Sequence, residues 1–395
     1  MSLFDTFLLL HDCFPFMLSL YLHVPFCRAR CNYCDFYLIT RQEYIDAFFM
    51  ALSLETIFRA PILKGQTVNA IHFGGGTPSM VPVHYLAGWL DEIASFCTFT
   101  SDIEIALEAN PEDLYGTRVM DELRSAGITR LSLGIQSFVD EKLRVLGRVH
   151  TAFQSQAVAA GALKRFESVS VDLICGVPGE ELLHWNRDLE SALTLRPEHL
   201  SLYMLSVEPK TRLNRNVLNG TVIIPDDGVQ SSLYEHAMRV LGVQGYNHYE
   251  ISNFCLPGYH SRYNLATWER KPYLGFGPAA HSFFMSNGHE IRTANVSSLS
   301  RYLANPESAE GFREELSEKE RFTEQVFLSL RINSGLDVEF LRKGNKLGYR
   351  LSQIIARFEA KGWIRLEKGR LYLTEKGFLF ADFIAGNLIF GHQAC

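Results

Sequence analysis

Three cysteines near the amino end of the chain are spaced for one shared metal or cluster site. Cys27, Cys31 and Cys34 form a C-x3-C-x2-C pattern, so a single loop brings three sulfur ligands together. Thiolates are soft ligands that suit zinc, copper(I) or iron–sulfur clusters. Structural zinc sites and [4Fe–4S] clusters usually take four protein ligands, yet no fourth Cys or His follows within ten residues. On a four-iron cluster, three cysteines would leave one iron open to a small molecule.

A glycine-rich turn follows the next strand-like run. Gly74, Gly75, Gly76 and Thr77 come directly after an apolar stretch that ends at Phe73. Glycines let the backbone approach a ligand closely, and their amide groups are free to bind a carboxylate or phosphate. A triple glycine alone is equally consistent with a tight turn.

Single polar residues also stand at the ends of three later strand-like runs. They are Glu108, Gln136 and Asp172, and Arg148 follows in the loop or helix start after Gln136. Burying a carboxylate at the end of a strand costs free energy unless the carboxylate binds a ligand or a cation. Taken alone, each of these residues is also typical of a helix cap or a surface position.

The elements that would position these residues alternate between strand and helix. Helical patterns separate the strand-like runs, which predicts βαβ units, a parallel sheet and a partial (β/α)6 TIM-like barrel with its chemistry at the carboxyl ends of the strands. Two accessory strand regions are expected at 246–254 and 273–284. The expected barrel strands are Leu18–Val24, Val68–Phe73, Ile103–Glu108, Arg130–Ile135, Ser168–Cys175 and His199–Leu205.

Three regions follow from these patterns. Residues 1–16 are an apolar leader without the basic start or cleavage site of a signal peptide, and Met17 after them indicates a start placed too far upstream. Residues 17–300 are expected to form the α/β core, and residues 301–395 a smaller winged-helix-like domain in which helices precede a hairpin at Lys368-Gly369. The charged run Glu307–Glu320 is expected to be a solvated linker.

Composition limits the classes of protein to which the chain can belong. Its 395 residues are 47% apolar and carry a net charge of −6, which argues against a protein that coats nucleic acid or anionic lipid. The basic stretch 341–376 is interpreted as part of a structural cap rather than as a nucleic-acid surface. Eight cysteines in this length do not make a disulfide scaffold, and free thiols fit a reducing cytoplasm. No apolar run is long enough for a membrane span.

Two stretches together resemble a known family. YLHVPFC at 21–27 with the two further cysteines, and HFGGGTPS at 72–79, are similar to the radical S-adenosylmethionine (SAM) superfamily. Within it, the chain resembles the oxygen-independent coproporphyrinogen III oxidase family, and most closely its haem-chaperone branch, from Leu18 to the C-terminus. The resemblance implies a [4Fe–4S] cluster on Cys27, Cys31 and Cys34, with SAM on the fourth iron. One electron from the cluster would split SAM into methionine and a 5′-deoxyadenosyl radical.

The same resemblance implies roles for individual residues. The turn with Gly75, Gly76 and Thr77 matches the element that holds the amino group of SAM. The further positions that match SAM contacts or aromatic residues beside the cofactor are Tyr21, Tyr33, Glu108, Gln136, Arg148 and Asp172. No catalytic residue is assigned.

Two features bear on the branch of the family. The oxidase branch has a fourth cysteine where this chain has Phe36, and it has a longer extension before the first strand. The chaperone branch carries a His-Asn-x-x-Tyr-Trp element associated with haem, whereas this chain has Tyr263 and Thr267 at the His and Tyr positions, with Trp268 kept. Imidazole and phenolate both ligate haem iron. Tyr263 is therefore a candidate haem ligand, with His260 and His281 as substitutes.

The sequence thus predicts a cytoplasmic radical SAM protein that binds haem or a porphyrin and passes haem to an acceptor protein, with an electron donor that supplies the cluster. One alternative is an oxidase that decarboxylates coproporphyrinogen III to protoporphyrinogen IX. The other is a zinc-stabilised protein that binds nucleic acid through its C-terminal domain.

Overall fold

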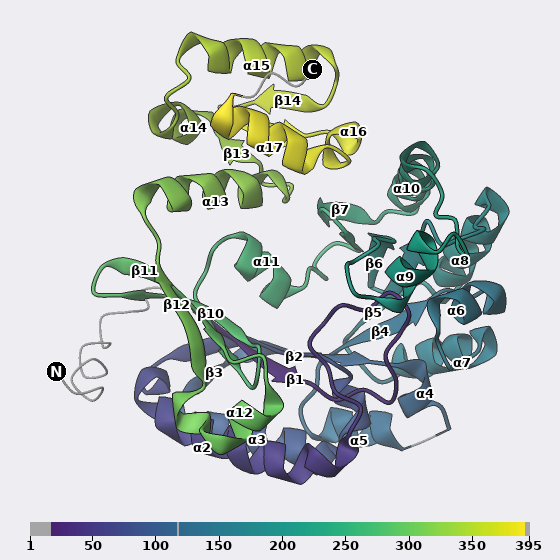
Figure 1. The fold of residues 1–395 in the computed structure, drawn as a ribbon, viewed down its shortest axis with the longest axis vertical. Helices are drawn as coiled ribbons and strands as arrows, with labels where there is room; N and C mark the ends of the chain where they lie inside the picture. The colour runs from purple at the N-terminus through teal and green to yellow at the C-terminus, as the bar shows by residue number, and fades with distance from the viewer. Residues whose placement is uncertain (1–16, 117, 392–395) are drawn as a thin grey trace.

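One open sheet of twelve strands forms the centre of the protein (Figure 1). The structure is a computed structural model that describes residues 17–116 and 118–391. Six parallel strands lie side by side in chain order, as the strand–helix alternation predicts. These strands are β1 (Leu18–Val24), β2 (Thr67–Gly75), β3 (Thr98–Ala109), β4 (Arg130–Gln136), β5 (Ser168–Cys175) and β6 (His199–Met204). The predicted partial barrel is confirmed.

Helices cover the outer face of these six strands. In Figure 1, α2, α3 and α5 lie along the bottom of the sheet, and α6, α7 and α8 along its right side. Their apolar faces pack on the sheet in one large core, which is why parallel strands such as β1 are buried along nearly their whole length. The helices are α2 (Ile45–Leu63), α3 (Val83–Phe96), α4 (Pro111–Leu114), α5 (Val119–Ser125), α6 (Asp140–Leu146), α7 (Ala152–Ala162) and α8 (Leu182–Leu195). Short 3-10 helices η2 (Gln42–Tyr44) and η3 (Pro78–Met80) follow the cysteine loop and the glycine turn.

Accessory strands extend the sheet at both edges. Beyond β1 lie β9 (Tyr273–Phe276), β10 (His281–Ser286), β11 (His289–Asn295) and β12 (Glu310–Glu315), and beyond β6 lie β8 (Asn253–Cys255) and β7 (Asn247–Glu250). The predicted accessory regions at 246–254 and 273–284 are therefore confirmed as strands. The helices of this part are α9 (Arg212–Leu218), α10 (Asp227–Val243), α11 (Arg262–Trp268) and α12 (Leu299–Ala304), with the 3-10 helix η4 (Pro306–Ser308).

The charged run Glu307–Glu320 differs from its prediction. It was expected to be a solvated linker, but its middle is β12, which pairs antiparallel with β11 from Ile291↔Glu315 onward. An edge strand exposes many of its side chains, so a charged sequence such as EGFREE is compatible with pairing. The core sheet thus continues to Glu315, and we place the start of the C-terminal unit at Ser317 rather than near residue 300.

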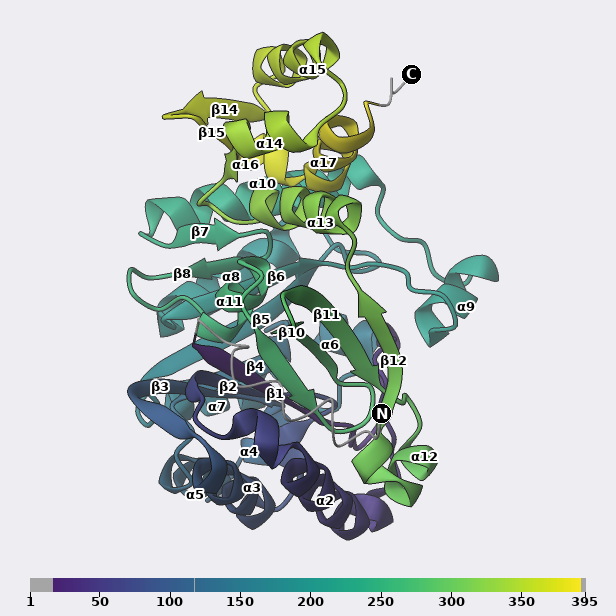
Figure 2. The same cartoon turned by 90° about the vertical axis from the view of Figure 1, so that its left-hand side faces the viewer.

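The C-terminal unit has its own small core, and its helices and strands lie together at the top of Figure 2. Its helices are α13 (Glu318–Leu330), α14 (Val338–Gly344), α15 (Tyr349–Ala360), α16 (Glu375–Phe378) and α17 (Ala381–Phe390), and its strands are β13 (Leu336–Asp337), β14 (Ile364–Glu367) and β15 (Arg370–Leu373). Lys368 and Gly369 both have positive φ between β14 and β15, which is the geometry of a tight hairpin turn. The helices followed by this hairpin match the predicted winged-helix-like arrangement.

Two sequence expectations concern the remaining residues. The leader at 1–16 lies outside the described residues. Within 17–116 and 118–391, no helix combines the length and hydropathy that crossing a bilayer requires.

Candidate functional site

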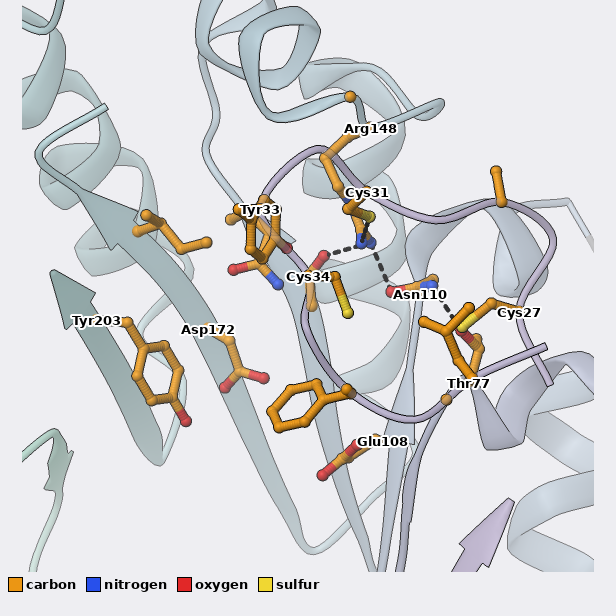
Figure 3. A pocket seen from close by; sticks show the side chains of 18 of the residues that line it. Cys27, Cys31, Tyr33, Cys34, Thr77, Glu108, Asn110, Arg148, Asp172 and Tyr203 are labelled. Atoms are coloured by element: carbon orange, nitrogen blue, oxygen red, sulfur yellow. Dashed lines mark hydrogen bonds between the residues drawn. The ribbon is translucent and has the colours of Figure 1, made fainter. Parts of the chain in front are cut away.

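A cavity of about 430 Å³ opens at the carboxyl ends of the barrel strands. It brings together eleven of the residues singled out in the sequence, because the carboxyl ends of parallel strands meet at one edge of the sheet. These are Cys27, Cys31, Tyr33, Cys34, Gly75, Gly76, Thr77, Glu108, Gln136, Arg148 and Asp172. Figure 3 shows the labelled side chains around one space, with the cysteine loop passing over the strand ends. Tyr21, His260 and Tyr263 are not part of this lining.

The cysteine loop is held in place by its backbone. Cys27 N–H donates to Ile39 O (2.9 Å), Ile39 N–H donates to Pro25 O (2.7 Å), and Asn32 N–H donates to Leu146 O (3.1 Å). These bonds close the base of the loop and attach its tip to α6.

Arg30 also binds the loop from within. Its guanidinium donates to the carbonyl oxygens of Cys34, Phe36 and Leu38 at 3.1–3.2 Å. One side chain therefore satisfies three carbonyls of a segment that has little regular structure of its own.

A chain of hydrogen bonds connects two of the three cysteines. Cys27 Sγ lies 3.1 Å from Thr77 Oγ1, which accepts from Asn110 Nδ2 (3.1 Å). Asn110 Oδ1 in turn accepts from Arg148 (2.5 Å), and the same guanidinium donates to Cys31 Sγ (3.3 Å). Dashed lines in Figure 3 mark the bonds from Arg148 to Asn110 and from Asn110 to Thr77. Side chains from the segments that follow β2, β3 and α6 thus fix the thiols before any metal binds.

The chemistry of the donor set fits an iron–sulfur cluster. Burial raises the pKa of Cys27 to about 11 and also raises the pKa of Cys34, so these thiols lose protons when metal binds. Among the described residues, no three His, Cys, Asp or Glu side chains converge as they would around a single ion. Three thiols from one loop are soft ligands of the kind that iron–sulfur clusters use.

The glycine turn differs from one expectation. Its amide groups are already used, because Gly76 N–H donates to Val24 O (2.8 Å) and Thr77 N–H donates to Phe26 O (2.7 Å). A Cβ on Gly76 would lie 2.6 Å from Phe26 O, so the glycine allows the two strand ends to meet. The expectation that these amides are free for an anion is wrong. A contact with the amino group of SAM would use acceptor atoms of the turn.

Glu108 sits at the end of β3 between the turn and the lumen of the barrel. Its carboxylate accepts from Gly75 N–H (3.3 Å) and lies 3.0 Å from His72 Nε2. A Cβ on Gly74 would lie 2.8 Å from the Glu108 carboxylate, so a side chain at this position would displace the carboxylate. The Glu108 side chain is 42% exposed, which leaves it accessible to a ligand in the cavity.

Asp172 is the second carboxylate of the cavity. Burial raises the pKa of Asp172 to about 6, against the lowering effect of hydrogen bonds from Ser201, Ser132 and Ser170. The Ser132 hydroxyl lies 2.9 Å from one carboxylate oxygen, and the Ser170 hydroxyl lies 3.1 Å from the other. The serines leave part of the carboxylate facing the cavity, where a donor such as a hydroxyl could bind.

Gln136 and Tyr33 complete the lining. Gln136 has φ of 66°, an uncommon value for a residue other than glycine, and such backbone strain is frequent at functional sites. Burial raises the pKa of Tyr33 above its usual range, although the nearby Arg148 opposes this shift. The Tyr33 hydroxyl therefore remains a neutral hydrogen-bonding group.

Tyr21 and Tyr263 lie together in the lumen instead of in the cavity. The Tyr263 ring stacks on His72 with 5.1 Å between centroids and on Tyr21 with 5.8 Å. Burial raises the pKa of Tyr263 well above its ordinary value, which disfavours the phenolate that iron would require. His260 packs edge-on against Tyr249 (4.7 Å), away from the cysteines, and His281 lies at the start of β10.

Sequence reasoning missed Asn110 and Ser132. Asn110 follows the end of β3, and its amide connects Thr77 to Arg148. Ser132 is an inward position of β4 next to Asp172. The strand periodicity of β4 could have placed Ser132 on the lumen face, whereas the role of Asn110 depends on contacts between distant segments.

Comparisons with known proteins agree with this geometry. The profile of the Radical SAM superfamily matches residues 21–192, and that of the HemN C-terminal domain matches residues 316–380. A relative described as "Heme chaperone HemW" from Bacillus subtilis is 35% identical over 389 residues, which is 95% of this chain and 98% of the relative. A protein with the same description from Mycobacterium tuberculosis is 34% identical over 377 residues, or 94% of each chain.

A solved structure has the same fold. Coproporphyrinogen III oxidase (HemN) from Escherichia coli, described as a radical SAM enzyme, superposes with a TM-score of 0.83. The alignment covers 99% of this chain and 94% of that chain, with 24% sequence identity. This likeness confirms the barrel with its C-terminal unit as a shared architecture.

Proposed function

The chain belongs to the HemW family of the radical SAM superfamily, and from this premise we propose that it binds haem and hands it to an acceptor protein in the cytoplasm. The observation that carries the proposal is the identity of 33–35% to bacterial proteins described as haem chaperones, over more than nine-tenths of this chain. Phe36 at the position of the fourth cysteine of the oxidases points in the same direction.

The cofactors of the superfamily are a [4Fe–4S] cluster and SAM. Cys27, Cys31 and Cys34 would hold the cluster, which supplies one electron to SAM when both are bound. Arg148 and Thr77 would hold two of the cysteine sulfurs in position through the bonds described above.

The other cavity residues would bind SAM. Glu108 and Asp172 offer carboxylate oxygens to donor groups of the ligand, and Gln136 offers an amide at the end of β4. Tyr33 provides an aromatic face and a neutral hydroxyl beside Arg148. Tyr21 would support the cofactor site from the lumen of the barrel, where it stacks with His72 and Tyr263.

Tyr263 is the candidate iron ligand for haem, by its position in the element that matches His-Asn-x-x-Tyr-Trp. Its ring stacks on His72, so a change at either residue would alter the position of the hydroxyl. His260, on the loop before α11, is the alternative ligand.

A haem titration of the holo-protein tests the proposal. Haem is added anaerobically and followed by absorbance in the Soret region, and transfer is then measured by adding an apo-haem protein. We expect saturable binding of one haem per chain and release to the acceptor. Tyr263→Phe and His260→Ala, tested in parallel, identify the ligand as the variant that changes the Soret spectrum.

The same preparation tests the oxidase alternative. Incubation with SAM, a reductant and coproporphyrinogen III should give no protoporphyrinogen IX. Product formation without haem transfer would overturn the chaperone proposal.

A further inference from the structure

A second cavity lies where the barrel meets the C-terminal unit. Its volume is about 570 Å³, within the range of small-molecule sites. One wall comes from the end of β6 and the turn between β7 and β8, and the other from α16, α17 and the segment between them. We call it the interdomain groove and define it by Tyr203, Met204, Arg331, Phe380, Asp382 and Phe383.

The interdomain groove adjoins the cofactor cavity. Tyr203 and Met204, the last two residues of β6, line both spaces. Figure 3 shows Tyr203 on the same side of the site as Asp172. A molecule in the groove would therefore lie beside the cofactors without displacing them.

The groove exposes large apolar side chains on both walls. Tyr203, Met204, Phe380 and Phe383 are each 40–43% exposed, and all four line this one space. Exposed apolar side chains that gather in one concave place mark a binding site more often than isolated ones do.

The aromatic wall is rigid. The Phe380 ring stacks on Trp363 with 4.4 Å between centroids and 19° between planes, and Phe383 meets the same Trp363 edge-on. Two rings held by a third offer a fixed surface to a flat apolar ligand.

The groove also contains one cation. Arg331, just after α13, pairs with Asp382, and its guanidinium lies 5.9 Å from the ring of Trp268. The Arg331 side chain is 19% exposed and that of Asp382 is 71% exposed. The carboxylate of Asp382 can therefore move into solvent and leave the guanidinium to a carboxylate of a ligand.

We propose that the interdomain groove binds a tetrapyrrole through the faces of the ring and through one carboxylate on Arg331. This inference rests on the proposed function and adds to it a docking place for the cargo that is separate from Tyr263, which does not line the groove. The contacts in this proposal are made to the faces of the ring and to one carboxylate, so they do not involve the iron. Metal-free protoporphyrin IX should bind as tightly as haem does at this place.

The experiment titrates the reconstituted holo-protein with haem, with protoporphyrin IX and with its dimethyl ester, which lacks free carboxylates. The double variant Phe380→Ala/Phe383→Ala should bind protoporphyrin IX at least roughly tenfold more weakly, because it loses both aromatic faces. Phe312→Ala is the matched control, since Phe312 is 46% exposed on β12 and lies outside the groove. Arg331→Gln should weaken binding of the free acid but not of the dimethyl ester.

Asp382→Asn provides a test that misfolding cannot imitate, because its expected result is a gain of affinity. Asp382 is largely exposed, and its replacement frees Arg331, so the free acid should bind several-fold more tightly while the ester does not change. If the wild type binds neither haem nor porphyrin, the proposed function is wrong, and the proposal for the interdomain groove is wrong as well. If the wild type binds both haem and porphyrin, the two variants Phe380→Ala/Phe383→Ala and Asp382→Asn should differ from it in affinity. If both variants bind with the wild-type affinities and keep their iron content, the assignment of the groove is wrong while the proposed function stands.

Discussion

Thr77 Oγ1 lies 3.1 Å from Cys27 Sγ, although fifty residues separate the two in the chain. The contact joins the glycine turn to the cysteine loop, and through Asn110 it continues to Arg148 and Cys31. The cluster ligands are thus part of the hydrogen-bond system of the barrel. Mutations of Thr77 or Asn110, which follow β2 and β3, can therefore affect the cluster site even though neither residue is a cluster ligand.

Replacement of a single cysteine should remove the cluster. Anaerobic reconstitution of the wild type should give about four irons per chain with brown absorbance, and Cys31→Ala should lose both, because two thiols do not hold the cube. Cys97→Ala is the control, since Cys97 lies at the end of α3. An iron content in Cys31→Ala equal to that of the wild type would refute the assignment.

Arg148→Lys should loosen the cysteine loop and thereby weaken SAM binding by about tenfold, because one ammonium cannot replace a planar fork that reaches Cys31, Asn110 and Gly134 together. Equilibrium dialysis with labelled SAM measures the change, with iron content recorded in the same sample. Arg144→Lys serves as control, because the Arg144 side chain is 71% exposed on α6. Equal losses in the two variants would exclude a specific role for Arg148.

Thr77→Val keeps the shape of the side chain but removes the hydroxyl between Cys27 and Asn110. We expect slower cluster assembly and iron loss several-fold faster in the presence of a chelator, because a buried amide loses its acceptor. Thr77→Ser retains the hydroxyl and should behave as the wild type. Identical iron loss from Thr77→Val and Thr77→Ser would show that the hydroxyl has no part in holding the loop.

Asp172 should make stability depend on pH. Its folded pKa of about 6 lies above its unfolded value, so the folded state binds the proton more tightly and the free energy of unfolding falls as pH rises from about 4 to about 6. Asp172→Asn removes this loss, which amounts to no more than about 3 kcal/mol. Thermal midpoints at pH 4.5 and pH 7.5 without SAM measure it. Asp91→Asn on α3 keeps Asp172 and should follow the wild-type curve, and parallel curves for wild type and Asp172→Asn would contradict the prediction.

Tyr263→His restores the histidine of the motif. Neutral imidazole needs no ionisation to bind iron, whereas burial holds the Tyr263 phenol in its protonated form. We therefore expect haem to bind about tenfold more tightly to Tyr263→His, with a changed Soret maximum. Metal-free porphyrin should bind both proteins equally. An unchanged spectrum would mean that residue 263 does not contact the iron.

The barrel and most of its site could be predicted because they depend on local patterns. The limits of β1 and β5 match the expected ones, since a run of apolar β-forming residues ends at Pro25 in one case and at Gly176 in the other. The eleven cavity residues follow from family motifs and from the rule that sites lie at strand ends.

Other features needed the three-dimensional structure. The use of the Gly76 and Thr77 amides by Val24 and Phe26 depends on how β1 and β2 end beside each other. The pairing of β12 depends on an edge that β11 offers, which outweighs the polar composition of the strand. The stack of Tyr21, His72 and Tyr263 likewise combines residues from three elements.

The passage from β12 to α13 contains only Leu316 and the helix cap Ser317. Leu316 is buried and its N–H donates to Glu290 O (2.9 Å), while Glu324 on α13 binds Arg292 (2.5 Å) and Arg270 (3.5 Å) from the barrel side. Barrel and C-terminal unit are therefore expected to tumble as one rigid body instead of opening about a hinge. The width of the interdomain groove is then fixed when the chain folds. A bound cargo must therefore leave through the open side of the groove.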